Sequence, residues 1–209
     1  MSTKAQYHHG DLKTALEAAA LELVAQKGPR AFTLAEASRR AGVSAAAPYK
    51  HFADRDALLA ALAAKGYREG ERRMVAAVQL EIGAPARFER FASEYVRFAI
   101  EERALFEIIH LAGIDKSKYP EVVAAQQSGY LAVIELTADV RDDPQAAASV
   151  LNSVVIVAHG VAMFLLDTNS NPTTDELGQS MREASRLARL IVESQDWGSP
   201  SPFGIQNSL

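Results

Sequence analysis

Residues 32–44 read FTLAEASRRAGVS, and this stretch decides the fold. Thr33 and Glu36 occupy the two positions of a capping box, in which each side chain accepts a hydrogen bond from the backbone amide of the other. A short helix is therefore predicted to begin at Thr33. Gly42 can adopt the positive φ that a sharp turn requires, and Ser44 can cap a second helix. Two short helices joined by such a turn form a helix-turn-helix.

Longer helices are predicted on both sides of this pair. Upstream, apolar residues recur on one helical face over residues 12–24, and Gly28-Pro29 ends that helix. Downstream, the second short helix is predicted to span residues 44–52. Asp54 then caps a helix that continues to about residue 81.

Composition favours helices over strands along the whole chain. Alanine, the best helix former, supplies 38 of the 209 residues and is depleted in strands. Pro85, Pro120 and Pro144 stand where the first turns of further helices are expected. A second capping box begins at Thr173. The predicted fold is all-α, with an N-terminal three-helix helix-turn-helix domain, a larger helical bundle and about nine helices in total.

Residues 150–166 are apolar around the whole circumference of a helix, so that helix must be buried on every side. We predict a homodimer through helices near residues 144–167 and 175–195, packed as a two-fold interface. The alternative is that residues 150–166 form the central helix of a monomer. The predicted domains are residues 1–55 for the helix-turn-helix, residues 56–196 for the bundle and residues 197–209 for an irregular tail.

The sequence contains no cysteine, which excludes disulfides, thiolate metal sites and thiol nucleophiles and is typical of the cytoplasm. Residues 1–11 lack the apolar core of a secretory signal, and no uninterrupted apolar run approaches the roughly 18 residues that cross a bilayer. No P-loop, metalloprotease motif or dinucleotide fingerprint occurs, and the histidine spacing supports no metal site. We therefore expect a cytoplasmic protein with no enzymatic activity, no cofactor, no metal and no membrane partner.

The net charge of −4 at first argues against a nucleic-acid partner. However, residues 1–55 carry 8 Lys and Arg against 5 Asp and Glu, a net charge of +3, whereas the remaining residues carry −7. Salt screens charges over a distance of about 8 Å under physiological conditions. Only the local charge of the N-terminal segment therefore bears on phosphate contact.

Three runs in the N-terminal segment belong together: Phe32 to Ser44, Tyr49-Lys50-His51-Phe52 and Arg55-Asp56-Ala57-Leu58-Leu59. With these runs, the segment resembles the DNA-binding domain of the TetR family of transcriptional regulators, without gaps from about residue 10 to residue 60. Residues 8–12 and 158–162 are similar to a subgroup with a C-terminal Trp-His-Gly signature, although Val155 or a neighbour stands in place of the Trp.

This resemblance implies that the third helix enters the major groove while the second and fourth helices contact phosphates. Thr33 offers a hydroxyl and a helix N-terminus to a phosphate. Arg55 stands where the family usually has Lys. The predicted DNA-binding residues are Thr33, Ser44, Ala45, Ala46, Ala47, Tyr49, Lys50, His51 and Arg55.

Two positions in the recognition helix depart from the family, which often has Gly where this chain has Ala46 and Leu where it has Pro48. Proline has no N–H, so Pro48 should remove the first helical hydrogen bond and make the opening turn irregular. The alanines at 45–47 offer no hydrogen bonds to base edges. We expect sequence specificity to depend on thymine methyl contacts and DNA shape.

The resemblance also implies that the helical C-terminal domain binds a small, apolar effector, which changes the separation of the two recognition helices and releases a repressor dimer from a palindromic operator. The alternatives are a helical regulator without an effector and, less favoured, a helical-bundle enzyme. Each effector candidate can also be explained by core packing. These candidates are Tyr95, Phe106, His110, Tyr130, His159 and Met163, aromatic or polar residues on otherwise apolar helices.

Overall fold

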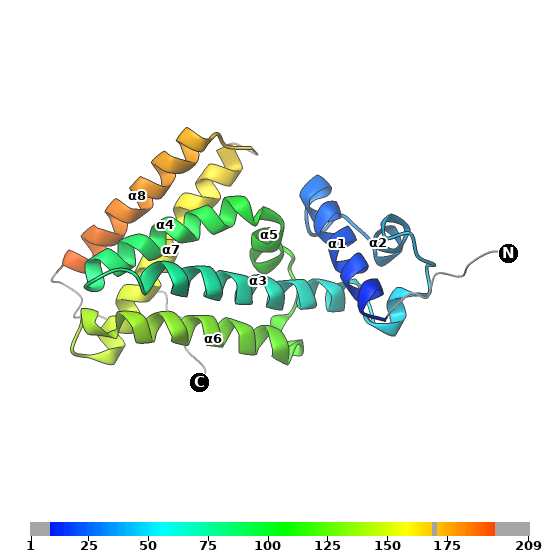
Figure 1. Ribbon diagram of the computed structural model, residues 1–209, viewed down its shortest axis with the longest axis horizontal. Helices are drawn as coiled ribbons and strands as arrows, with labels where there is room; N and C mark the ends of the chain where they lie inside the picture. The colour runs from blue at the N-terminus through cyan, green and yellow to red at the C-terminus, as the bar shows by residue number, and fades with distance from the viewer. Residues whose placement is uncertain (1–8, 169–170, 195–209) are drawn as a thin grey trace. The chain divides into compact units, whose positions relative to one another are not determined.

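The computed structural model describes residues 9–168 and 171–194, and no strand occurs among them (Figure 1). This confirms the all-α prediction, and the eight α-helices in these ranges are close to the predicted number. The predicted tail at 197–209 lies outside the described residues. The elements are α1 (His9–Lys27), α2 (Leu34–Arg40), η1 (Pro48–Lys50), α3 (Arg55–Val78), α4 (Ala84–Glu101), α5 (Arg103–Leu111), η2 (Lys116–Lys118), α6 (Pro120–Thr137), η3 (Ala138–Val140), α7 (Pro144–Thr168) and α8 (Thr174–Glu193), where η denotes a short 3-10 helix.

Most helix ends follow from the capping signals in the sequence. The Glu36 amide donates to the Thr33 hydroxyl at 3.2 Å, and the Thr33 amide donates to the Glu36 carboxylate at 2.8 Å. The same reciprocal pair opens α8. Gly28 and Gly42 have φ angles of +81° and +70°, as the turns after α1 and α2 require. The capping boxes and both turn glycines are therefore confirmed.

The chain forms two compact units. Unit 1 comprises the residues up to Arg68 together with Glu102–Gln126, and unit 2 comprises Glu69–Glu101 together with the residues from Gln127 onward. Helices α3 and α6 contribute residues to both units. The predicted division into a DNA-binding domain at 1–55 and a bundle at 56–196 is based on the expected functions of the two parts, and it stays a prediction.

Unit 1 is held together by one apolar core, to which α1, α2, α5 and parts of α3 and α6 contribute. Leu16, Leu58 and Ile108 are fully buried in it, and each such side chain contributes about 1.5–3 kcal/mol to folding. Gly66 lets α3 and α5 approach closely, since a Cβ there would lie 2.8 Å from Cδ1 of Ile109. Helix α5 is thus packed into the same core as the helix-turn-helix.

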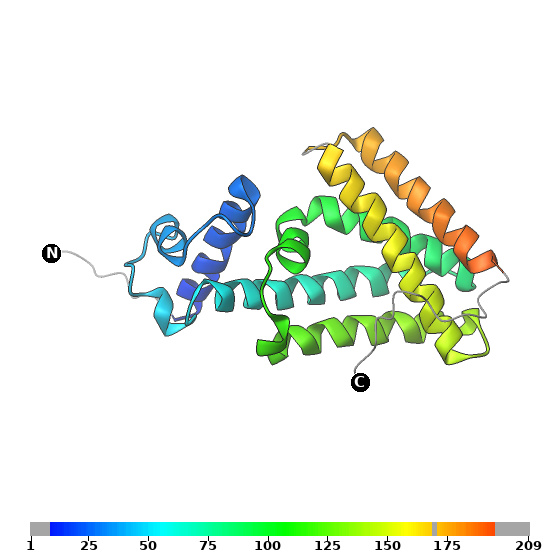
Figure 2. The ribbon, with the colours of Figure 1, turned by 180° about the vertical axis from the view of Figure 1, so that it is seen from behind.

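Unit 2 is built around α4, α7 and α8, which pack against one another (Figure 2). Phe88, Leu151 and Ala184 are among the fully buried residues from these helices. A buried ion pair joins α3 to α4, where Arg73 Nε donates to the Glu94 carboxylate at 2.8 Å. An ion pair of this kind is sensitive to the loss of either partner, because the remaining charge would stay buried.

Helix α7 corrects the expectation that no segment is apolar enough to cross a bilayer. By length and composition, Pro144–Thr168 could cross a bilayer, and 39% of its most apolar 18-residue window is buried within the single chain. One such helix is weak evidence for a membrane span, because core helices pass the same test. Its apolar surface is partly exposed, and Phe164 is 72% accessible.

Candidate DNA-binding site

Thr33 lies exposed at the N-terminus of α2. The Lys27 ammonium, 2.7 Å from the Glu36 carboxylate, and the Thr33 backbone amide together lower the pKa of Glu36 to about 2. The carboxylate that anchors the capping box is therefore ionised at neutral pH. This arrangement fixes the helix N-terminus where a phosphate oxygen could approach.

The segment from Ser44 to Phe52 differs from its prediction. It contains only the 3-10 helix η1 and flanking turns, so the predicted α-helix over residues 44–52, capped by Ser44, is wrong. The Ala47 amide donates to Ser44 O at 3.0 Å and the His51 amide to Pro48 O at 2.8 Å, both three residues back. Because Pro48 has no N–H, the α-helical hydrogen bond to Ser44 O cannot form. The proline effect is thus larger than predicted.

The predicted contact residues of this segment are unequally accessible. Ser44, Ala45, Ala46 and Lys50 are exposed, and Tyr49 is 63% accessible. By contrast, Ala47 is half-buried. His51 is also half-buried, and its Nε2 is buried without a hydrogen-bond partner among the described residues. The accessible surface that could meet DNA is therefore formed by the turn before Pro48 and by the first residues after it.

Arg55 is engaged inside the protein. Its guanidinium donates to Pro29 O and to the Asp56 carboxylate, the latter at 2.9 Å, and lies 5.3 Å from the centroid of the Phe32 ring. It thereby ties the start of α3 to the loop between α1 and α2. This role was not foreseen from the sequence, and the predicted phosphate contact of Arg55 stays a prediction.

The six effector candidates are divided between the two units. Phe106 and His110 belong to unit 1, with ring centroids 4.6 Å apart. In unit 2, the Tyr95 hydroxyl lies 3.1 Å from Nδ1 of His159, and burial lowers the pKa of His159. The Tyr130 hydroxyl, also in unit 2, is buried with no hydrogen-bond partner among the described residues.

The remaining candidate, Met163, is half-buried on α7 of unit 2.

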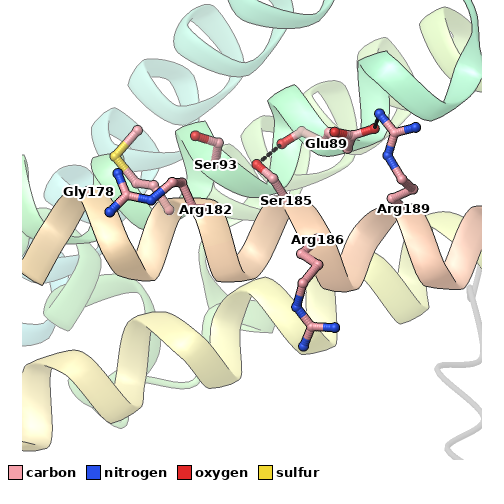
Figure 3. A pocket seen from close by; sticks show the side chains of 8 residues that line it. Glu89, Ser93, Gly178, Arg182, Ser185, Arg186 and Arg189 are labelled. Carbon is pink, nitrogen blue, oxygen red and sulfur yellow. Dashed lines mark hydrogen bonds and ion pairs between the residues drawn. The ribbon is translucent and has the colours of Figure 1, made fainter.

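A groove that the sequence reasoning missed lies between α4 and α8 (Figure 3), with a volume of about 440 Å³. Arginines spaced along one side of a helix were the signal that could have found it. No group of three potential metal ligands occurs in the part of the chain that the structure describes. The groove is lined by Glu89, Ser93, Gly178, Met181, Arg182, Ser185, Arg186 and Arg189.

The region around these candidate residues also matches a known family. A sequence profile for bacterial regulatory proteins of the tetR family matches residues 16–62. The N-terminal part of the chain thus resembles tetR-family regulators. This match indicates DNA-binding transcriptional regulation rather than catalysis.

Solved structures share the fold of most of the chain. A protein of unknown function from Rhodococcus sp. RHA1 is 29% identical, with 88% of this chain and 98% of that chain covered and a TM-score of 0.67. A tetR-family regulatory protein from Rhodococcus RHA1 is 20% identical, covering 91% and 98%, with a TM-score of 0.67. The multidrug binding protein EbrR, complexed with imidazole, is 19% identical, covering 94% and 100%, with a TM-score of 0.60. No protein of curated function matches this chain.

Substitutions at Arg55 and Lys50 test whether Arg55 stabilises the folded protein, because the first side chain is bound inside the protein and the second is exposed. Arg55→Ala should lower the free energy of unfolding by about 1–3 kcal/mol, because it removes hydrogen bonds from a partly buried guanidinium. Lys50→Ala should change it by less than about 0.5 kcal/mol, since its ammonium is exposed. Urea denaturation monitored by circular dichroism measures both values. An Arg55→Ala protein as stable as the parent would contradict the structural role.

Proposed function

We propose that this regulator binds a palindromic operator as a homodimer, represses transcription from that site and is released by a small, apolar effector. The cytoplasm, where its DNA partner is accessible, is its proposed location. The observation that carries the DNA-binding part is the accessible surface formed by Thr33, residues 44–46, Tyr49 and Lys50 within the region that matches the family.

The proposed contacts divide into phosphate binding and base readout. Thr33, Tyr49 and Lys50 bind backbone oxygens through a hydroxyl, a phenol and an ammonium, which fix the position of the protein on the duplex. Ala45 and Ala46 carry only methyl groups, which can contact the C5-methyl groups of thymine in the major groove. Because η1 is a single turn, fewer side chains reach the bases than from a full recognition helix, so DNA shape contributes to specificity.

The operator is tested by footprinting and mobility shift on the DNA that flanks the gene. We expect a protected palindrome whose half-sites are one helical turn apart, about 34–36 Å. Tyr49→Ala should weaken binding on every sequence, whereas replacing thymine by uracil in the site should weaken binding to the parent protein. A reporter placed behind the site should be repressed.

Three outcomes would count against these assignments. If the operator affinity is unchanged when uracil replaces thymine, the proposed thymine contacts are wrong. If Tyr49→Ala weakens binding only at particular bases, the proposed phosphate contact of Tyr49 is wrong. Reporter activation in place of repression would overturn the repressor proposal.

The proposed dimer is supported by apolar surface on α7 and α8. Ile156 and Phe164 are 44% and 72% accessible on α7, and Leu190 is 53% accessible on α8. These side chains belong to helices that pack against each other within unit 2. A second copy of the chain would cover them in a self-complementary two-fold contact.

A charge placed on this surface should prevent dimerisation. Phe164→Glu should shift the mass measured by light scattering to that of a single chain, 22.6 kDa, because a carboxylate would be buried without a partner. Operator affinity should fall by about 100-fold or more, since each monomer would bind alone. Leu131→Glu is the matched control, an exposed leucine on α6 whose replacement should leave the dimer intact. A dimeric Phe164→Glu protein would contradict the interface.

The proposed effector site centres on Tyr95 and His159. They form a polar pair between α4 and α7, and both side chains are half-buried. Burial favours the neutral imidazole, and a mostly apolar site with few polar groups suits a small apolar ligand. The fold relative EbrR, described as a multidrug binding protein, has been solved with imidazole, which supports a ligand-binding role for this chain.

Thermal unfolding with a library of apolar compounds tests the effector proposal. An effector should stabilise the protein in a saturable way, by about 2.7 kcal/mol at a concentration 100 times Kd, and should release the operator in a mobility shift. Tyr95→Phe removes only the hydroxyl and should weaken that effector. If no compound saturates, the regulator without an effector becomes the better description. If Tyr95→Phe leaves an effector unaffected, the site lies elsewhere.

A further inference from the structure

The groove between α4 and α8 has a polar wall built by one side of α8. Arg182 and Arg189 are seven residues apart, so they lie on the same side of the helix and about 10.5 Å apart along its axis. Ser185 stands between them, and its hydroxyl donates to the backbone oxygen of Glu89 on α4 at 3.0 Å. Figure 3 shows these side chains between the two helices, with Arg186 pointing away from Ser93 and Glu89.

The arginines of the groove differ in how their charge is balanced. Arg189 is paired with Glu89 at 2.5 Å and with Glu193 at 3.6 Å. Arg186 is paired with Glu183 at 2.6 Å. Within the residues described, Arg182 forms no ion pair. Arg182 is therefore the groove arginine that has no ion pair among the described residues.

The surroundings of Arg182 combine a hydroxyl with apolar surface. Ser93 is 8% accessible, and it lines the groove. Gly178, one turn before Arg182, has no side chain to fill the groove, and a Cβ there would lie 3.3 Å from the Arg182 guanidinium. Met181 contributes a half-buried thioether side chain.

We propose that this groove is a second small-molecule site, which binds an organic carboxylate with an apolar body. The Arg182 guanidinium holds the carboxylate through two parallel N–H···O bonds, a geometry that arginine favours for this group. The Ser93 hydroxyl donates to the ligand, and the apolar body lies over Gly178 and against Met181. The site contains none of the DNA-contact or effector candidates, so it goes beyond the proposed function.

The proposed site is compatible with the proposed dimer, because successive residues of a helix turn by about 100°. Ala184 and Ala188 mark the side of α8 that is buried in unit 2. Arg182, Ser185 and Arg189 follow on one flank of that side. Leu187 lies on the opposite flank, and Leu190 lies on the outer surface, about 40° around the helix from Arg186 and about 80° from Arg182. A partner that covers Leu190 therefore meets the groove at its outer edge and leaves the side of Ser185 open.

Calorimetric titration of the full chain with benzoate tests the proposal, with benzamide as the neutral analogue of the same shape. Benzoate should bind, and benzamide should bind at least about tenfold more weakly, because the carboxylate carries the charge-assisted contact. Arg182→Gln should weaken benzoate by about the same factor. Arg72→Gln is the matched control, since it removes an arginine of unit 2 that is paired with Glu69 outside the groove.

A second variant checks the position independently of charge. Gly178→Leu fills the groove while improving helix propensity, so it should abolish benzoate binding with an unchanged far-ultraviolet circular dichroism spectrum. The proposal is overturned if benzoate does not bind, if benzamide or inorganic phosphate binds equally well, or if Arg72→Gln weakens benzoate as much as Arg182→Gln. Operator binding by Arg182→Gln should match the parent, so a failure here would leave the proposed function intact.

Discussion

The shared apolar core of unit 1 is the constraint on which the candidate DNA-binding surface depends. A segment of about 50 residues buries too little apolar area to be more than marginally stable by itself. Here α1, α2 and the start of α3 obtain further burial from Leu105, Ile108 and Val122, which α5 and α6 supply. A hydrogen bond from Arg30 Nε to Leu111 O at 2.8 Å joins the same elements at the surface. The helix-turn-helix is therefore not an independent module, and any displacement of α5 must either move α1 or expose this core.

Burial also explains how residues 44–52 are held without a regular helix. Pro48, the first residue of η1, and Phe52, two residues after η1, are buried, and Phe32 is buried under the Arg55 guanidinium. These anchors fix the middle and the C-terminal end of residues 44–52. The segment gives up an α-helical hydrogen bond at Pro48 but keeps its attachment to the protein. Its exposed side chains are therefore positioned by the packing of Pro48 and Phe52.

Local signals in the sequence predicted more of the structure than long-range ones. The Thr33 capping box and the Gly42 turn were predictable because each depends on residues within four positions. Pro48 was recognised as a disturbance, but its extent depends on burial that only the folded core supplies. The hydrogen bond of Arg55 to Pro29 O and the contact of Ser185 with Glu89 in the groove join residues 26 or more positions apart, and no periodicity reports such pairings. The fold was thus readable from the sequence, and the partners of individual arginines were not.

The structure also alters the meaning of the +3 charge on residues 1–55. Lys27, Arg40 and Arg55 each pair with a carboxylate, and Lys13 lies 3.8 Å from Glu17. Arg30 is bound to Leu111 O. Within the described part of this segment, Arg30, Arg39 and Lys50 are the exposed cations without an ion pair, and Arg30 is already bound to Leu111 O. Because affinity for DNA rises with the number of phosphates neutralised, the two remaining cations on one chain provide little of it, and the proposed second copy would double their number.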